Sequence, residues 1–125
     1  MSFIYKIEAY KETSEDMMEV FANKDQNIYI LCDGAGGFGG GYNAAKTCIS
    51  LLKEKLLSQT ITETSLITDI RTTCFSLLSE GIGQTTLIVI VEKNNKIIGA
   101  SCGDSDAYLL KNDSIEHITK NQQNI

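Results

Sequence analysis

The sequence predicts an α+β fold in which helices cover antiparallel sheets. Short apolar runs rich in β-branched and aromatic residues occupy both ends of the chain, whereas two segments with helical periodicity follow one another in the middle. Several of the runs are joined by short Asn- and Asp-containing turns, which are typical of hairpins. Because parallel strands need a crossover between them, the order strands, helices, strands argues against βαβ winding. A chain of 125 residues, 42% of them hydrophobic, suits one domain with one core.

The individual elements follow from the change of period along the chain. Alternating or continuous apolar residues predict strands, and apolar residues at helical spacing predict helices. Thr60 and Glu63 have the spacing of a capping box before the second helix, which is expected to end near Gly81 and Gly83. The predicted strands cover residues 3–10, 17–22, 27–33, 87–91, 97–102, 107–110 and 115–119, and the predicted helices cover residues 43–57 and 66–78.

A glycine-rich segment follows the strand predicted over residues 27–33. Asp33 is followed by six glycines in eight positions, and residues 34–39 match the pattern GxGxxG. Binding of a dinucleotide or a methyl donor would also need a parallel sheet, which the order of elements does not provide. The charge of Asp33 would moreover face a pyrophosphate, and the Gly-Lys-Ser/Thr of a P-loop is missing. These classes are therefore disfavoured.

Carboxylates gather at one edge of the predicted sheet. A hairpin between the strands at 17–22 and 27–33 brings Glu15 and Asp16 next to Asp33. Such a cluster is repulsive unless cations neutralise it, and all-oxygen ligation suits Mg²⁺ or Mn²⁺. Two ions about 3.5–4 Å apart can activate a water and clamp a phosphoryl group, so phosphate-ester hydrolysis is the natural reaction. The alternative interpretation is that these are solvated loop carboxylates.

Composition excludes several other classes of protein. A formal charge of −5 argues against nucleic acid as a partner. The longest aliphatic run, residues 87–91, is too short to span a bilayer, so we expect no membrane association and a cytoplasmic location.

The four cysteines form no CxxC pair, and we expect them to be reduced, buried and structural. They are Cys32, Cys48, Cys74 and Cys102.

Four motifs follow one another along the chain. They are SED at residues 14–16, DGAGGFGGG at residues 33–41, GQTT at residues 83–86 and GDSDAYL at residues 103–109. In this order they are similar to the Asn-Glu-Asp, Asp-Gly-x-Gly-Gly, Gly-x-Thr and Gly-Asp-Ser-Arg-Ala-Tyr-Leu motifs of one family, the metal-dependent serine/threonine protein phosphatases (PPM, or type 2C). The resemblance extends over nearly the whole chain.

The resemblance implies an αββα sandwich of two antiparallel sheets flanked by helices, with a site for two Mn²⁺ or Mg²⁺ ions. It implies that Asp33 is the catalytic residue that bridges both ions, that Gly34 offers its carbonyl, and that Glu15 and Asp16 belong to the same cluster. It also implies a third, weaker ion at Asp104. Lys11 takes the place of a phosphate-binding arginine, and the substrate would be a phosphoprotein dephosphorylated at serine or threonine.

Three departures from the family pattern keep a second hypothesis open. Asp106 replaces the arginine of Gly-Asp-Ser-Arg, Ser14 replaces an asparagine, and the chain ends at Ile125, where the family's second half begins. Residues 1–125 are therefore expected to form a single phosphatase-like domain that lacks the C-terminal half. The alternative is an inactive phosphatase-like module that binds a partner protein. Exposed sheet edges also predict a homo-oligomer.

Overall fold

The computed structural model describes residues 16–35, 40–103, 108–111 and 114–117. Its main element is a four-stranded antiparallel sheet in the order β1-β2-β3-β4. These strands are β1 (Asp16–Asn23), β2 (Gln26–Ala35), β3 (Gln84–Lys93) and β4 (Lys96–Cys102). Between β2 and β3 the chain forms two helices, α1 (Gly40–Leu57) and α2 (Glu63–Ser79). The predicted strand at 3–10 lies outside the described residues.

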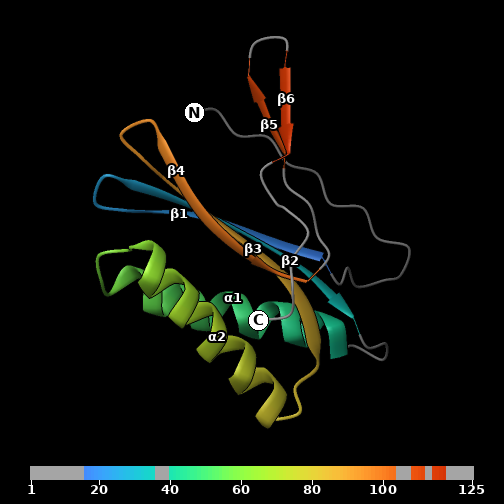
Figure 1. Cartoon of the computed structure of the whole chain (residues 1–125). Coiled ribbons are helices and arrows are strands. Elements are labelled where there is room, and N and C mark those ends of the chain that lie inside the picture. The colour runs from blue at the N-terminus through green and yellow to red at the C-terminus, as the bar shows by residue number, and fades with distance from the viewer. Residues whose placement is uncertain (1–15, 36–39, 104–107, 112–113, 118–125) are drawn as a thin grey trace.

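Both helices lie on one face of this sheet (Figure 1). A separate two-stranded antiparallel sheet, β5 (Tyr108–Lys111) with β6 (Ser114–His117), lies on the other side. The predicted α+β class and its antiparallel pairing are confirmed. No described helix is long and apolar enough to cross a membrane.

The core forms between the helices and the strand residues that point toward them. In β2 these are the even-numbered residues Ile28, Ile30 and Cys32, all 0% exposed, because alternate strand residues face opposite sides of a sheet. Apolar stripes on α1 and α2 complete the layer. The buried cluster comprises Ile28, Ile30, Cys32, Ala45, Cys48, Ile49, Leu52, Leu56, Ile61, Leu66, Ile70, Leu77, Leu87, Val89 and Val91.

Polar contacts fix the end of α1 on the edge strand β1. The Lys53 ammonium lies 2.7 Å from the Glu19 carboxylate and 5.4 Å from the centre of the Phe21 ring. The Asn23 amide donates to the Leu56 carbonyl at 2.9 Å. The first pair is partly exposed and contributes on the order of 0.5 kcal/mol. Together these contacts join the C-terminal half of α1 to β1.

Several predicted boundaries differ from the structure. β2 continues through Asp33 to Ala35, and α1 begins at Gly40 rather than at residue 43. The predicted capping box of Thr60 and Glu63 is wrong: Thr62 caps α2, and the Thr62 and Ser65 side chains each accept from the other's backbone N–H, at 3.1 and 2.8 Å.

The predicted end of α2 is correct in position. Gly81 has a φ of +65°, and the Ile82 N–H donates to the Leu77 carbonyl at 3.1 Å. This is the Schellman arrangement that a glycine after a helix favours.

Candidate metal centre at the carboxylate end of the sheet

Two of the predicted ligands lie directly opposite one another. Asp16 in β1 pairs with Asp33 in β2, and Asp33 pairs on its other side with Thr86 in β3. Directly opposed residues of an antiparallel pair have Cβ atoms about 4.5–5.5 Å apart. Like charges at that distance repel, so a cation shared by the two carboxylates would stabilise the arrangement. Asp33 is exposed, which leaves its carboxylate accessible to a ligand.

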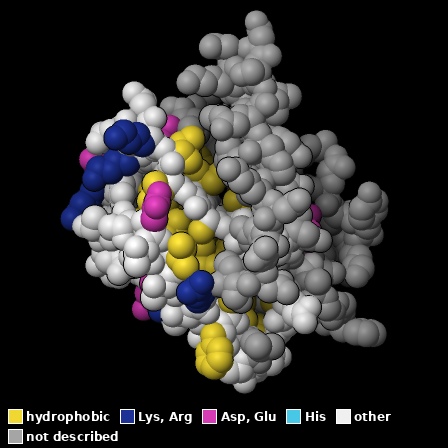
Figure 2. Space-filling view, in the orientation of Figure 1, with side chains coloured by type: hydrophobic (Ala, Val, Ile, Leu, Met, Phe, Trp, Pro, Cys, Tyr) yellow, Lys and Arg dark blue, Asp and Glu magenta, His cyan; other side chains and the backbone are white. Residues whose placement is uncertain are grey.

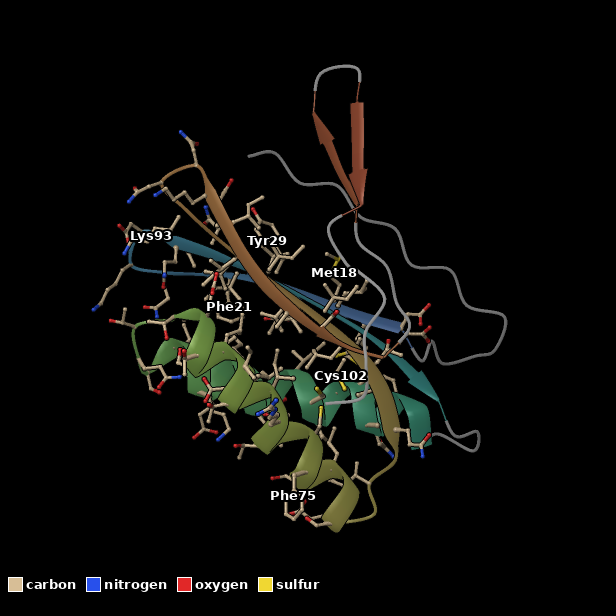
Figure 3. All side chains as sticks on the ribbon, viewed as in Figure 1. Met18, Phe21, Tyr29, Phe75, Lys93 and Cys102 are labelled. Carbon is tan, nitrogen blue, oxygen red and sulfur yellow. The ribbon has the colours of Figure 1, made fainter. Side chains whose placement is uncertain are left out.

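These three side chains lie on the face of the sheet turned away from the helices. The alternation along β2 sets this direction, because Cys32 points into the core and Asp33 therefore points the other way. In Figure 3, Met18 and Tyr29 occupy that same outer side, whereas Phe21 lies between the sheet and the helices. The helix layer supports the site from behind and leaves the carboxylates on the open side.

Glycines bring the end of β2, the start of α1 and the start of β3 into contact. A Cβ at Gly34 would collide with the Gly41 backbone, and a Cβ at Gly83 would stand 2.6 Å from the Gly40 carbonyl oxygen. Gly83 also has a φ of +143°, which L side chains rarely adopt. Gly34 is buried, so the backbone next to Asp33 is packed closely against the start of α1.

Gly103, the first residue of the GDSDAYL motif, also lies beside this site. Gly103 has a φ of +104°, and a Cβ there would lie 2.8 Å from the Thr86 methyl group. Thr86 was not among the predicted site residues. Its place beside Asp33 depends on pairing between strands that are about fifty residues apart, so the only signal in the sequence was the GQTT motif itself.

The other predicted site residues lie outside the described residues. These are the metal ligands Glu15 and Asp104, the phosphate-binding Lys11, and the departures Ser14 and Asp106. Within the ranges that the structure describes, no group of three His, Cys, Asp or Glu side chains is arranged to hold a metal ion. The donors that are described, two carboxylates and the Gly34 carbonyl, are all oxygen and fit the hard cations Mg²⁺ and Mn²⁺.

Three lysines lie at one end of the sheet, and the two carboxylates of the candidate site lie at the other. Lys24, Lys93 and Lys96 lie at the hairpin turns, and Asp16 and Asp33 lie at the other end. Figure 2 shows basic side chains gathered on the side where Figure 1 places these turns. Lys93 is 3.7 Å from Asp25, also at the turn end. These three lysines are therefore too far from Asp33 to contact a phosphate bound there.

The direction of the strands next to β2 argues against dinucleotide binding. Both β1 and β3 run antiparallel to β2. The glycine-rich segment therefore does not follow a strand of a parallel sheet, as a dinucleotide-binding turn would. An antiparallel sheet with helices on one face and paired carboxylates at its end instead defines an α+β protein with a candidate metal centre.

Comparison with known proteins agrees with this class. The Protein phosphatase 2C family matches residues 9–124, and the chain belongs to that family. The serine/threonine phosphatase stp of Listeria innocua is 31% identical over an alignment of 122 residues, and the match covers 86% of this chain and 48% of that protein. The chain thus spans about half the length of the curated relatives that it matches.

Solved structures of bacterial phosphatases share the fold. One, a bacterial serine phosphatase with a point substitution, has a TM-score of 0.80 at 26% identity and covers 92% of this chain and 58% of its own. Another is the catalytic domain of the serine/threonine protein phosphatase PstP in complex with 2 manganese ions. Its TM-score is 0.68 at 25% identity, and the match covers 90% of this chain and 51% of the PstP chain.

Proposed function

We propose that this chain is part of a metal-dependent protein serine/threonine phosphatase and that Asp33 anchors its metal ions. The observation that carries the proposal is the direct pairing of Asp16 with Asp33 at the open end of the sheet, in a chain that belongs to the Protein phosphatase 2C family. Bound manganese in the PstP catalytic domain supports Mn²⁺ or Mg²⁺ as the cofactor. The substrate class is a phosphoprotein, in line with the Listeria relatives, which are named serine/threonine phosphatases.

The roles of the chain's own residues follow from their placement. Asp33 and Asp16 would hold the ions from adjacent strands, and Gly34 would add its carbonyl oxygen. Bound metal ions supply a water of lowered pKa and a clamp on the phosphoryl oxygens. The close approaches of Gly34 to Gly41 and of Gly83 to Gly40 would keep the Asp33 backbone fixed, so its carboxylate would need little reorganisation when it binds a metal ion. Glu15 and Asp104 are proposed as further ligands, and Lys11 as the phosphate contact.

The remaining proposals concern the domain organisation of the chain, its location in the cell and its partner. Residues 1–125 are proposed to form one phosphatase-like unit. A cytoplasmic location is supported by the four free cysteines, because cytosolic proteins keep their thiols reduced. The formal charge of −5 supports a protein partner over nucleic acid.

Calorimetric titration of Mn²⁺ into the 125-residue chain tests the metal site. We expect saturable binding that weakens at least about tenfold in Asp33→Asn, which removes a charged ligand but keeps its shape. Asp25→Asn is the matched control, because Asp25 is exposed at the opposite end of the same hairpin. Its affinity should equal that of the wild type.

Hydrolysis of p-nitrophenyl phosphate and of a phosphothreonine peptide, with and without Mn²⁺, then tests the reaction. Turnover that requires the metal and is lost in Asp33→Asn supports the phosphatase. Absence of Mn²⁺ binding would overturn the metal role of Asp33. It would favour the inactive, partner-binding module instead.

A further inference from the structure

A cavity lies at the hairpin-turn end of the sheet, where the helix layer stops. α1 ends at Leu57 and α2 begins at Glu63, and the segment that joins them lies at this end of the molecule (Figure 1). The cavity has a volume of about 250 Å³. Its lining comes from three strands, one hairpin turn and the segment between the helices: Gln26, Ile61, Val91, Lys93, Asn94, Lys96 and Ile98.

The register of the sheet divides this lining into an apolar and a basic row. Val91 in β3 is directly opposite Ile98 in β4, and Val91 and Ile61 belong to the buried core between the sheet and the helices. Two positions nearer the turn, Lys93 is directly opposite Lys96 on the same face of the sheet. The cavity therefore has an apolar floor and two ammonium groups at its rim.

The turn between β3 and β4 holds the two lysines opposite one another. Asn94 and Asn95 have φ angles of +52° and +62°, and positive φ at both central residues is characteristic of a type I′ hairpin turn. Like charges on directly opposed strand residues are destabilising. Lys93 has Asp25 at 3.7 Å, but both side chains of this pair are exposed, so its contribution is small. An anion between Lys93 and Lys96 would remove the repulsion.

A buried amide adds a hydrogen-bonding group to the cavity. Gln26 lies on the same side of β2 as Ile28 and is only 7% exposed. Among the side-chain hydrogen bonds of the described residues, none involves the Gln26 amide. A buried polar group without a partner costs free energy, so a ligand oxygen that accepts from this amide would be stabilised.

We propose that this cavity binds a small organic anion. Its apolar body would lie on Ile61, Val91 and Ile98, and its carboxylate or phosphate group would lie between the two lysines. An apolar lining with a few placed polar groups is typical of sites for small molecules. The volume equals that of about eight water molecules at about 30 Å³ each, which suits an aromatic or branched-chain acid.

The cavity and the candidate metal centre lie at opposite ends of the same strand. Gln26 begins β2, and Asp33 lies near the other end. At about 3.3 Å per residue, the two residues are about 23 Å apart along the strand. Figure 3 shows Lys93 at the turn end. A small ligand in the cavity therefore does not contact Asp33, and its binding does not depend on whether the chain hydrolyses phosphate esters.

NMR titration of the isotope-labelled 125-residue chain, without added metal, tests the proposal. The probes are phenylacetate and benzylphosphonate, which differ in their acidic group, and phenethylamine, which carries the opposite charge on a similar body. We expect at least one anion to shift the backbone N–H signals of Lys93, Asn94 and Lys96 and the side-chain NH₂ signal of Gln26. The shifts should saturate with a dissociation constant on the order of 1 mM or below. The amine should leave these signals unchanged, and the anion that binds more tightly identifies the preferred acidic group.

Two lysine variants separate a defined site from general attraction to a basic surface. Lys96→Gln removes one of the opposed charges and should weaken binding about tenfold. Its free energy of unfolding should stay equal or rise, because the substitution relieves the repulsion between the lysines. Lys24→Gln is the matched control, since Lys24 is exposed at the same end of the sheet but does not line the cavity. Its affinity should stay within about twofold of the wild type.

Three results would each overturn the proposal. The first is the absence of saturable shifts at the cavity with either anion. The second is an equal response to phenethylamine, which would mean that the lysines do not select the charge. The third is equal weakening by Lys24→Gln and Lys96→Gln, which would mean that the anions are attracted to this end of the sheet without a defined site.

Discussion

At the scale of single residues, the candidate site depends on the absence of one side chain. Gly34 follows Asp33 in β2, and a Cβ at this position would overlap the Gly41 backbone at the start of α1. Gly34→Ala therefore forces β2 away from α1 or α1 away from the sheet. We expect it to destabilise the chain by about 2 kcal/mol or more and to weaken Mn²⁺ binding. Denaturant unfolding and calorimetry measure the two effects.

Gly40→Ala is the control within the same segment. A Cβ at Gly40 meets no atom within 4 Å, and the residue begins α1. Alanine has a higher helix propensity than glycine, so the free energy of unfolding should stay equal or rise. Equal losses in both variants would mean that any side chain in the glycine-rich segment is harmful, and would contradict the specific contact at Gly34.

At the scale of elements, the start of α2 illustrates what sequence alone leaves open. Thr60 with Glu63 and Thr62 with Ser65 both have polar partners three residues apart, so propensity does not choose between them. Packing does: Ile61 is 5% exposed and Leu66 1%, and both belong to the core. Burial of the residue before the cap and of the fourth helical residue places the cap at Thr62, as in a hydrophobic staple.

Removal of this cap has a measurable cost. Thr62→Ala leaves the Ser65 N–H without its 3.1 Å partner, and we expect a loss of about 1 kcal/mol in the free energy of unfolding. Thr64→Ala, at an exposed position of α2, should be neutral or slightly stabilising. Thermal or urea unfolding of both variants checks the difference. If Thr60→Ala lowered the free energy of unfolding and Thr62→Ala did not, the capping box predicted from the sequence would be correct.

Features that depend on residues close in the sequence were predicted. The extension of β2 and the neighbour of Asp33 in β3 depend on residues far apart in the sequence and were not predicted. The hairpin of β1 and β2 is local, so the pairing of Asp16 with Asp33 followed from the sequence. The extension of β2 through Gly34 did not, because glycine weakens isolated strands and this segment is held by its pairing with Thr85 in β3. For the same reason Thr86 was missed as a neighbour of Asp33.

At the scale of the whole molecule, the sheet leaves edges that could associate. Among the described strands, β1 and β4 have a hydrogen-bonded neighbour on one side only. Each carries an exposed apolar residue, Val20 at 41% and Ile97 at 37%. Unpaired edges with exposed apolar side chains promote pairing between chains. The most exposed large apolar residue described, however, is Phe75 on α2 at 70%, so association through the helices is the competing arrangement.

Sedimentation velocity over a range of concentrations distinguishes the two arrangements. If edges associate, the wild-type sedimentation coefficient rises with concentration, and Val20→Lys or Ile97→Lys lowers it, because a charge on an edge strand opposes pairing. Phe75→Lys should then have no effect, because Phe75 is exposed on a helix that covers one face of the sheet and does not supply the backbone groups of a strand edge. A monomer at every concentration, or dissociation caused by Phe75→Lys alone, would contradict edge pairing. Because each substitution changes an exposed or partly exposed side chain, unchanged unfolding curves would assign the difference to association and not to loss of the fold.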